Sequence, residues 1–304
     1  MCSFGVRVIV NFGSVALDTT RTPFKTAEDV LGGSGTFFGL AASFFHETGL
    51  IGVVGDDFPN EYMQLLEDRL DLAGLVVEKG KTFRFDSSFG YDLGTRTTIR
   101  TDLNVFGRWE PTVPDEYKDA PYLYLGNIDP EQQLGVLDQM DEPELTVADT
   151  IELWINTKKD RLIEVISRVN GVVLNVEEVR QLCQVPNIIK GARTILDWGA
   201  DFVVVKKGEH GSILFTPETI FPTCGYPLEE IVDPTGAGDA FAGGFMGHLA
   251  RKGKMTDKAM REAIVYGNVM GSFAVERFSV DRFLELTMED IEGRYRKYKE
   301  MVAF

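Results

Sequence analysis

The sequence predicts a three-layer α/β fold in which helices cover both faces of a mostly parallel central sheet and a small accessory β-sheet projects from it. Short apolar runs of strand length alternate along the chain with helix-like stretches. The runs are continuously apolar, which is typical of parallel strands buried on both faces. One region, 79–109, interrupts the alternation with many Thr, Arg, Asp and Phe residues and no helical period. Ligands of such sheets bind at the carboxyl ends of the strands, so candidate functional residues are sought there.

The elements of the central domain follow in order. Predicted strands lie at 6–12, 50–54, 122–125, 145–148, 171–174, 202–206 and 212–215. Predicted helices lie at 36–47, 59–70, 130–140, 160–170 and 188–198, and a further helix follows Asp239 to about Leu249. Within 160–170 the apolar side chains recur at helical spacing and predict one buried face: Leu162, Val165, Ile166 and Val169.

The remaining strands are polar and predict an accessory sheet. Segments 82–86 and 96–101 resemble half-exposed strands around a turn at 92–94, and 17–31 is also polar and strand-like. We expect a single domain over 1–304, in which 13–35 and 79–108 form this small β-sheet. A surface hairpin without a role is the alternative.

Composition excludes several classes of protein. The chain has 304 residues, and 31 basic against 47 acidic residues give a net charge of −16, which argues against nucleic acid as a partner. A hydrophobic fraction of 44% is too high for a disordered chain. The apolar runs are far shorter than the roughly 20 residues of a membrane span, and the N-terminus lacks the pattern of a secretory signal. Cys2, Cys183 and Cys224 are few and widely spaced, which favours a reducing, cytoplasmic compartment without a disulfide framework.

The most specific motif is Asp-Pro-Thr-Gly-Ala-Gly-Asp at 233–239, directly before a predicted helix. Gly236 and Gly238 allow the backbone to approach a ligand closely, and free N–H groups at a helix N-terminus bind anions. Asp239 beside such an anion site has the chemistry of a general base that takes a proton from an attacking hydroxyl. The alternative is a glycine-rich turn in which Asp239 is an ordinary acid of the first helical turn.

Other candidate sites are weaker. Segment 74–82 ends like a P-loop, but five residues separate Gly74 from Gly80 where a P-loop has four. No dinucleotide-binding glycine pattern follows the first strand. His46, His210 and His248 are dispersed and lack the spacing of metal ligands.

With these motifs in view, the chain resembles the PfkB/ribokinase family of carbohydrate kinases. The 233–239 segment matches the family's D-x-T-G-A-G-D signature. Further matches follow in the family's order at 13–18, 32–33, 52–58, 175–178 and 206–211. The resemblance covers nearly the whole chain and implies a ribokinase-like fold, ATP as phosphoryl donor and Mg²⁺, and leaves activation by a monovalent cation open.

The resemblance also assigns roles on the nucleotide side. Asp239 corresponds to the catalytic base, and the anion hole corresponds to Gly236, Ala237 and Gly238. Asn175 and Glu178 correspond to an N-x-x-E motif that places Mg²⁺ and the phosphates, with Glu178 toward the metal. The nucleotide-binding positions correspond to Lys206, Lys207, Gly208, Gly211 and, in the adenine pocket, Asn268. Alternation along a strand lets only one of the two lysines point inward.

The acceptor side corresponds to Asp18, whose carboxylate would accept hydrogen bonds from substrate hydroxyls, and to the Gly32-Gly33 pair. After this pair the chain reads Ser-Gly-Thr-Phe-Phe and lacks the Lys and Asn of ribokinases, so the sugar cannot be inferred from them. Asn127 follows a strand and could face the substrate. The resemblance further implies that the small β-sheet over 13–35 and 79–108 is a β lid that closes over the substrate. Arg96, on this lid, could reach a phosphate or acidic group of a substrate or could be a solvated strand residue. Lids of the family often also form a dimer contact, which leaves a homodimer through the lid open.

The sequence therefore predicts an ATP-dependent kinase that phosphorylates a hydroxyl of a sugar or sugar-like molecule. The alternative acceptor is a nucleoside such as inosine, adenosine or cytidine. Phe37 and Phe38 after the diglycine could favour a base, or could belong to a helix core. A non-catalytic sugar sensor with the same fold is a further alternative, against which the intact Asp239, Asn175 and Glu178 argue.

Overall fold

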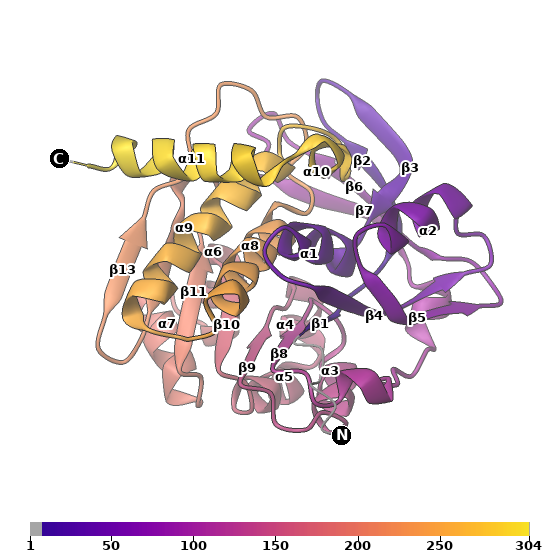
Figure 1. Cartoon of the computed structure of the whole chain (residues 1–304), viewed down its shortest axis with the longest axis horizontal. Helices are drawn as coiled ribbons and strands as arrows, with labels where there is room; N and C mark the ends of the chain where they lie inside the picture. The colour runs from indigo at the N-terminus through magenta and orange to yellow at the C-terminus, as the bar shows by residue number, and fades with distance from the viewer. Residues whose placement is uncertain (1–7, 304) are drawn as a thin grey trace.

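The computed structural model describes residues 8–303, and its centre is a nine-stranded sheet (Figure 1). The strand order is β13 (Ile220–Thr223), β12 (Ser212–Phe215), β11 (Phe202–Lys206), β10 (Gly171–Asn175), β9 (Leu145–Ala148), β8 (Tyr122–Leu125), β1 (Ile9–Phe12), β4 (Thr48–Gly55) and β5 (Asp71–Glu78). From β11 to β5 all neighbours pair in parallel, whereas β12 and β13 are antiparallel. The carboxyl ends of the parallel strands consequently share one edge.

Helices cover both faces of this sheet. One face packs against α3 (Pro130–Leu137), α5 (Lys159–Ile166), α6 (Val176–Cys183) and α7 (Ile188–Asp197). The other packs against α1 (Ser34–Ser43), α8 (Ala237–Lys252) and α9 (Asp257–Ala274), which stand in front of the sheet in Figure 1. The remaining helices are α2 (Asn60–Glu67), α4 (Glu152–Thr157), α10 (Asp281–Glu285) and α11 (Met288–Met301). Strand β1 shows why both faces are covered, since Val10 and Phe12 join one core cluster and Ile9 the other.

Strand β1 is tied directly to the start of α1. The buried Asn11 donates its side-chain N–H to the Gly35 carbonyl at 2.6 Å. Gly13 approaches so closely that a Cβ there would lie 2.3 Å from the Gly35 Cα atom. This contact brings the Gly32-Gly33 pair next to the carboxyl end of the central strand.

A separate four-stranded sheet accounts for the polar strands. It consists of β3 (Thr26–Gly32), β2 (Ala16–Arg21), β6 (Phe83–Phe89) and β7 (Arg96–Asp102), in that order, and projects at the upper right of Figure 1. β2 and β6 run parallel, with Asp18 opposite Phe85 and Thr20 opposite Ser87. We call the face that carries these four residues the inner face of the lid. The alternate residues form an outer face with ion pairs of Arg21 to Asp86 and Arg84 to Asp29.

The predicted mostly parallel α/β fold is confirmed, and the seven predicted strands are present. Residues 6 and 7 of the first predicted strand lie outside the described residues. β5 was not predicted although it contains a continuous apolar run at 72–77, and β13, which is only four residues long and contains Pro222, was not predicted either. The helix predicted at 160–170 ends at Ile166, although Val169 is still buried in the core.

Two further expectations can be compared with the described residues. Within 8–303 none of the helices combines the length and the apolar character that crossing a membrane requires. Cys183 and Cys224 are free thiols, and Cys2 lies outside the described residues.

Candidate active site

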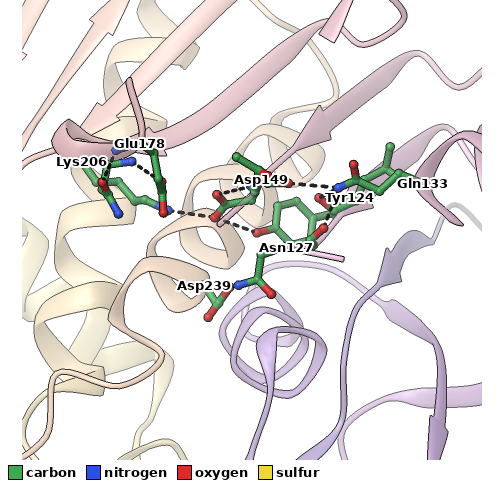
Figure 2. Close-up of polar contacts among 11 residues, drawn as sticks. Tyr124, Asn127, Gln133, Asp149, Glu178, Lys206 and Asp239 are labelled. Carbon is green, nitrogen blue, oxygen red and sulfur yellow. Dashed lines mark hydrogen bonds and ion pairs between the residues drawn. The ribbon is translucent and has the colours of Figure 1, made fainter. Parts of the chain in front are cut away.

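Functional side chains gather at the carboxyl edge of the parallel strands, between the start of α8 and the inner face of the lid. Asn127 and Asp149 follow β8 and β9, and Asn175 and Lys206 end β10 and β11. Asp239 comes from the first turn of α8. Figure 2 shows Asp239 facing Asn127, and Lys206 reaching toward Asp149.

The anion-binding geometry predicted for 236–239 is present. Helix α8 begins after Gly236, which has a φ of +74° and no capping side chain. A Cβ at Gly236 would lie 2.3 Å from the Phe37 ring, so this turn requires glycine for its conformation and its space. The loop before it is held because Asp233 accepts a hydrogen bond from the Thr235 N–H at 2.9 Å. The N–H of Ala237, predicted from the sequence to be part of the anion hole, instead donates to the Pro234 carbonyl at 3.3 Å. The next N–H groups of this helix N-terminus, those of Gly238 and Asp239, are the ones left for an anion.

Asp239 has the environment of a general base. Its Oδ1 lies 3.5 Å from Nδ2 of Asn127, whose backbone carbonyl accepts a hydrogen bond from the Trp154 indole. Burial, followed by the charge of Asp149, raises the pKa of Asp239 to about 7, and Lys206 acts in the opposite direction. A base with this pKa is half ionised at neutral pH, where it can both accept and release a proton.

Lys206 and Asp149 form a buried ion pair beside the anion site. Nζ of Lys206 lies 2.8 Å from Oδ2 of Asp149, and the two side chains are 15% and 4% exposed. Burial opposes the charge of Lys206, but Asp149 and Glu178 outweigh it and raise the pKa of the ammonium group. A Cβ at Gly238 would lie 3.1 Å from this Nζ, so the ammonium group lies against the first turn of α8. Lys206 is thus the lysine that points inward.

Asp149 is the main residue that the sequence did not single out. Its carboxylate also accepts hydrogen bonds from the Thr150 N–H at 2.7 Å and from the Tyr124 hydroxyl at 3.4 Å. Gln133 fixes the same turn by donating to the carbonyls of Gly126 and Asp149. Asp149 could have been found from the sequence as an acidic residue directly after a predicted buried strand, at the edge of the sheet where ligands bind.

Asn175 and Glu178 form a reciprocal cap at the start of α6. The Asn175 side chain accepts from the Glu178 N–H at 2.9 Å, and the Glu178 carboxylate accepts from the Asn175 N–H at 2.7 Å. Burial and then the charge of Asp149 raise the pKa of Glu178, while Lys206 opposes this. The carboxyl group is thus fixed at the site and lacks an ion-pair partner of its own among the described residues.

The carboxylates of Glu178 and Asp149 could contribute to a Mg²⁺ site only as a minor part of its ligands. Residues 8–303 hold no cluster of three or more His, Cys, Asp or Glu that could form a complete metal site. Mg²⁺ usually keeps several waters and takes one or two carboxylates together with substrate phosphates. Glu178, with Asp149 as its charged neighbour, suits a metal that is held largely by a nucleotide.

Asp18 lies on the inner face of the lid with an unused oxygen. It is 5% exposed, and its Oδ1 has no hydrogen-bond partner among the described residues. Gly32 packs on this carboxyl group, since a Cβ there would lie 2.0 Å from Oδ2, and Gly33 has a φ of +96°. Burial and then the charge of Asp233 raise the pKa of Asp18 to about 8. The arrangement suits a group that donates hydrogen bonds to this carboxyl.

Arg96 is the first residue of β7 and pairs with Phe89 of β6. Its guanidinium lies 5.4 Å from the centre of the Phe85 ring. Burial is the largest cause of the raised pKa values of Asp18, Asp239 and Glu178, and Arg96 acts against it in all three. The only cation–carboxylate pair among these groups in the described structure is Lys206 with Asp149, so Arg96 remains available for an anion.

The remaining predicted residues lie at the antiparallel end of the sheet. Gly208 and Gly211 adopt φ values of +57° and +86° in the turn between β11 and β12. Asn268 bonds with the hydroxyl groups of Ser212 at 3.0 Å and Thr223 at 2.9 Å, which anchors α9 to β12 and β13. Its place in an adenine pocket remains a prediction, as do the nucleotide roles of Lys207 and the two glycines.

Phe37 and Phe38 belong to the core. They are 1% and 0% exposed, and Phe38 stacks on Tyr124 with ring centres 3.8 Å apart. Neither ring offers a face to a base, so the alternative that they form helix core holds.

Comparisons with known proteins show what this chain is similar to as a whole. The model of the pfkB family carbohydrate kinases matches residues 13–286. The cytidine kinase of Thermococcus kodakarensis is 31% identical over 258 residues, covering 83% of this chain and 92% of that protein. The nucleoside kinase of Burkholderia thailandensis, solved with inosine, has a TM-score of 0.79 at 16% identity and covers 95% of this chain and 97% of its own. The fructokinase of Vibrio cholerae, solved with fructose, ADP and calcium, has a TM-score of 0.76 at 19% identity over 95% and 99%.

The last two similarities show the fold, whereas the family model and the cytidine kinase extend over most of the sequence. The enzyme class also follows, because members of this family transfer a phosphoryl group to a hydroxyl acceptor. The chain belongs to the pfkB family of carbohydrate kinases.

Proposed function

We propose that this protein is an ATP- and Mg²⁺-dependent kinase that transfers the γ-phosphate to a hydroxyl group of a ribonucleoside. One observation supports it most: Asp239, with its pKa raised by burial to about 7, lies at the uncapped start of α8 beside Lys206. This places a base, a helix N-terminus and a cation around one point. Phosphoryl transfer needs exactly these parts, because its catalysis consists largely of positioning and charge stabilisation.

The proton and the phosphoryl group have separate partners in this mechanism. Asp239 accepts the proton of the attacking hydroxyl as the new O–P bond forms, while the bond between the γ-phosphorus and the bridging oxygen of ATP breaks and ADP leaves. Asn127 orients the Asp239 carboxylate. The N–H groups of Gly238 and Asp239 and the Lys206 ammonium group stabilise charge on the transferred phosphoryl group. Asp149 keeps Lys206 in place and charged. When bound, Mg²⁺ would neutralise phosphate charge from the side of Glu178.

The acceptor is held from the lid. Asp18 accepts hydrogen bonds from neighbouring hydroxyls, and the absence of side chains at Gly32 and Gly33 leaves room for a sugar ring. These features suit sugars and nucleosides alike. The ribonucleoside is preferred here because the cytidine kinase matches 83% of the chain at 31% identity.

The test is a panel of acceptors with the purified protein, ATP and Mg²⁺. It contains cytidine, uridine, adenosine, inosine, D-ribose, D-fructose and myo-inositol, and ADP release and phosphorylated product are both measured. We expect a ribonucleoside to give the highest kcat/KM. Asp239→Asn should lower kcat by about 10²–10⁴-fold, the range of general-base catalysis. Full turnover by this variant would refute the mechanism, and a preference for a free sugar would refute the acceptor.

A further inference from the structure

We propose that Phe85, Ser87 and Phe89 on the inner face of the lid form the subsite for the aromatic base of the acceptor, with Ser87 as a specificity-determining residue. The inference rests on the proposed kinase function and deepens it. It starts from a hydroxyl group that the fold buries and leaves without a partner.

Ser87 is 1% exposed, and its Oγ makes no hydrogen bond among the described residues. Burying a hydroxyl without a partner is unfavourable, since the group loses its hydrogen bonds to water. On the neighbouring strand of this sheet the buried hydroxyl of Thr20 does have a partner, since it lies 3.2 Å from the hydroxyl of Thr235. An unpaired, buried hydroxyl on a face that looks into the site is suited to a ligand.

The register places Ser87 on the correct face. Ser87 is opposite Thr20, whose hydroxyl lies 3.2 Å from that of Thr235, immediately before the anion-binding turn. On the same strand pair, Phe85 is opposite Asp18. Neighbouring strands lie about 4.8 Å apart, so a ring whose hydroxyls bond to Asp18 has its other substituents within reach of β6.

The neighbours of Ser87 are aromatic. Residues i and i+2 of a strand share one face about 6.6 Å apart, so Phe85 and Phe89 flank Ser87 on the inner face. Phe85 is half-buried and already has the planar guanidinium of Arg96 packed at 5.4 Å from its ring centre. The Phe85 ring therefore has a face that accepts a planar group.

Two aromatic rings with a single hydroxyl between them suit a flat group with apolar faces and a polar edge. A heteroaromatic base has this chemistry, and a hydroxyl can donate to or accept from its ring edge. A free sugar or a cyclitol presents hydroxyls in all directions and would leave several of them unpaired against these rings. The sequence left contact with a base open for Phe37 and Phe38, but both rings are enclosed in the core. In this proposal Phe85 and Phe89 of β6 contact the base instead.

The experiment compares Ser87→Ala with Ser88→Ala, the neighbouring serine on the outer face. For each protein, kcat/KM is measured with the best ribonucleoside of the panel and with D-ribose, and the melting temperature is measured without ligand. Ser87→Ala should lower kcat/KM for the nucleoside by about 3- to 10-fold, the value of one uncharged hydrogen bond, and leave that for D-ribose unchanged. Its melting temperature should equal or exceed that of the wild type, because the hydroxyl it removes has no partner. Ser88→Ala should match the wild type with both acceptors.

Equal effects of Ser87→Ala on both acceptors, no effect on either, or a lower melting temperature would overturn the subsite while nucleoside kinase activity persisted. A wild type that phosphorylates D-ribose or myo-inositol better than every ribonucleoside would overturn the subsite and the proposed acceptor but leave the kinase mechanism standing. Absence of any transfer would overturn the proposed function and the subsite together.

Discussion

The sharpest consequence of the site is that Asp18 destabilises the free protein at neutral pH. Burial raises the pKa of this carboxyl group from 3.8 to about 8, so the folded chain holds a proton that the unfolded chain releases. The folded state then binds more protons between about pH 4 and pH 8, and stability falls as the pH rises through that window. At pH 7 the contribution is roughly 4 kcal/mol, at 1.36 kcal/mol for each pH unit above the unfolded pKa.

Asp18→Asn removes this contribution because an amide does not ionise. The amide also buries an N–H donor that has no partner in the free protein, which costs about 1 kcal/mol and leaves a net gain of about 3 kcal/mol at pH 7. For a chain of 304 residues this gain corresponds to an increase of about 5 °C in melting temperature. At pH 4 the gain should vanish, and the variant should lose acceptor affinity at every pH.

The assay is thermal unfolding of the wild type and the variant between pH 4 and pH 8.5, without nucleotide or metal. Glu28→Gln, a change at an exposed acid of the same lid, is the matched control and should leave the pH profile unaltered. A wild type and an Asp18→Asn protein with parallel pH profiles would show that Asp18 ionises normally in the fold. The burial argument for the acceptor site would then be wrong.

Three further predictions concern the catalytic side. The kcat/KM of the wild type should rise with pH through about 7, because the free enzyme must ionise Asp239, whose pKa burial raises to that value; a flat profile between pH 6 and 8 would contradict the assignment of the base. Lys206→Met should lower both kcat and the unfolding free energy, the latter by about 3–5 kcal/mol, since it leaves the Asp149 carboxylate buried and unpaired, and Lys207→Met should do neither. Glu178→Gln should raise the Mg²⁺ concentration for half-maximal activity with little change in acceptor KM, and an unchanged Mg²⁺ titration would exclude Glu178 from the metal site.

The parts of the site that could be predicted from sequence are those within short segments. The turn at 233–239 and the N-x-x-E cap carry their geometry in consecutive residues, so Asp239 and Glu178 were identified before any fold was known. The β lid was also predictable, because its polar strands differ from the apolar strands of the main sheet. A short sequence motif was therefore sufficient to propose a site residue wherever the geometry of that part of the site is set by consecutive residues.

The rest depends on contacts between distant segments. The Lys206–Asp149 pair joins two strands 57 residues apart, and only the sheet order makes them neighbours. The same applies to Ser87, since its burial and its lack of a partner follow from the register of β6 against β2. Phe37 and Phe38 were left open between a ligand contact and a helix core by their sequence position, and the packing of α1 places both rings in the core.

The charge of the site also explains how a chain with a net charge of −16 can serve a phosphate donor. Asp18, Asp149, Glu178 and Asp239 converge there with Lys206 as the paired cation and Arg96 at the edge. In the free protein burial, with the charges of neighbouring acids added to it, raises the pKa values of three of these carboxyls, so protons supply part of the missing positive charge. A divalent metal bound with a nucleotide would supply positive charge beside Glu178 and would favour ionised carboxyls over protonated ones. In the proposed mechanism Asp239 is therefore expected to be more fully ionised, and so more available as a base, when the phosphate donor is bound.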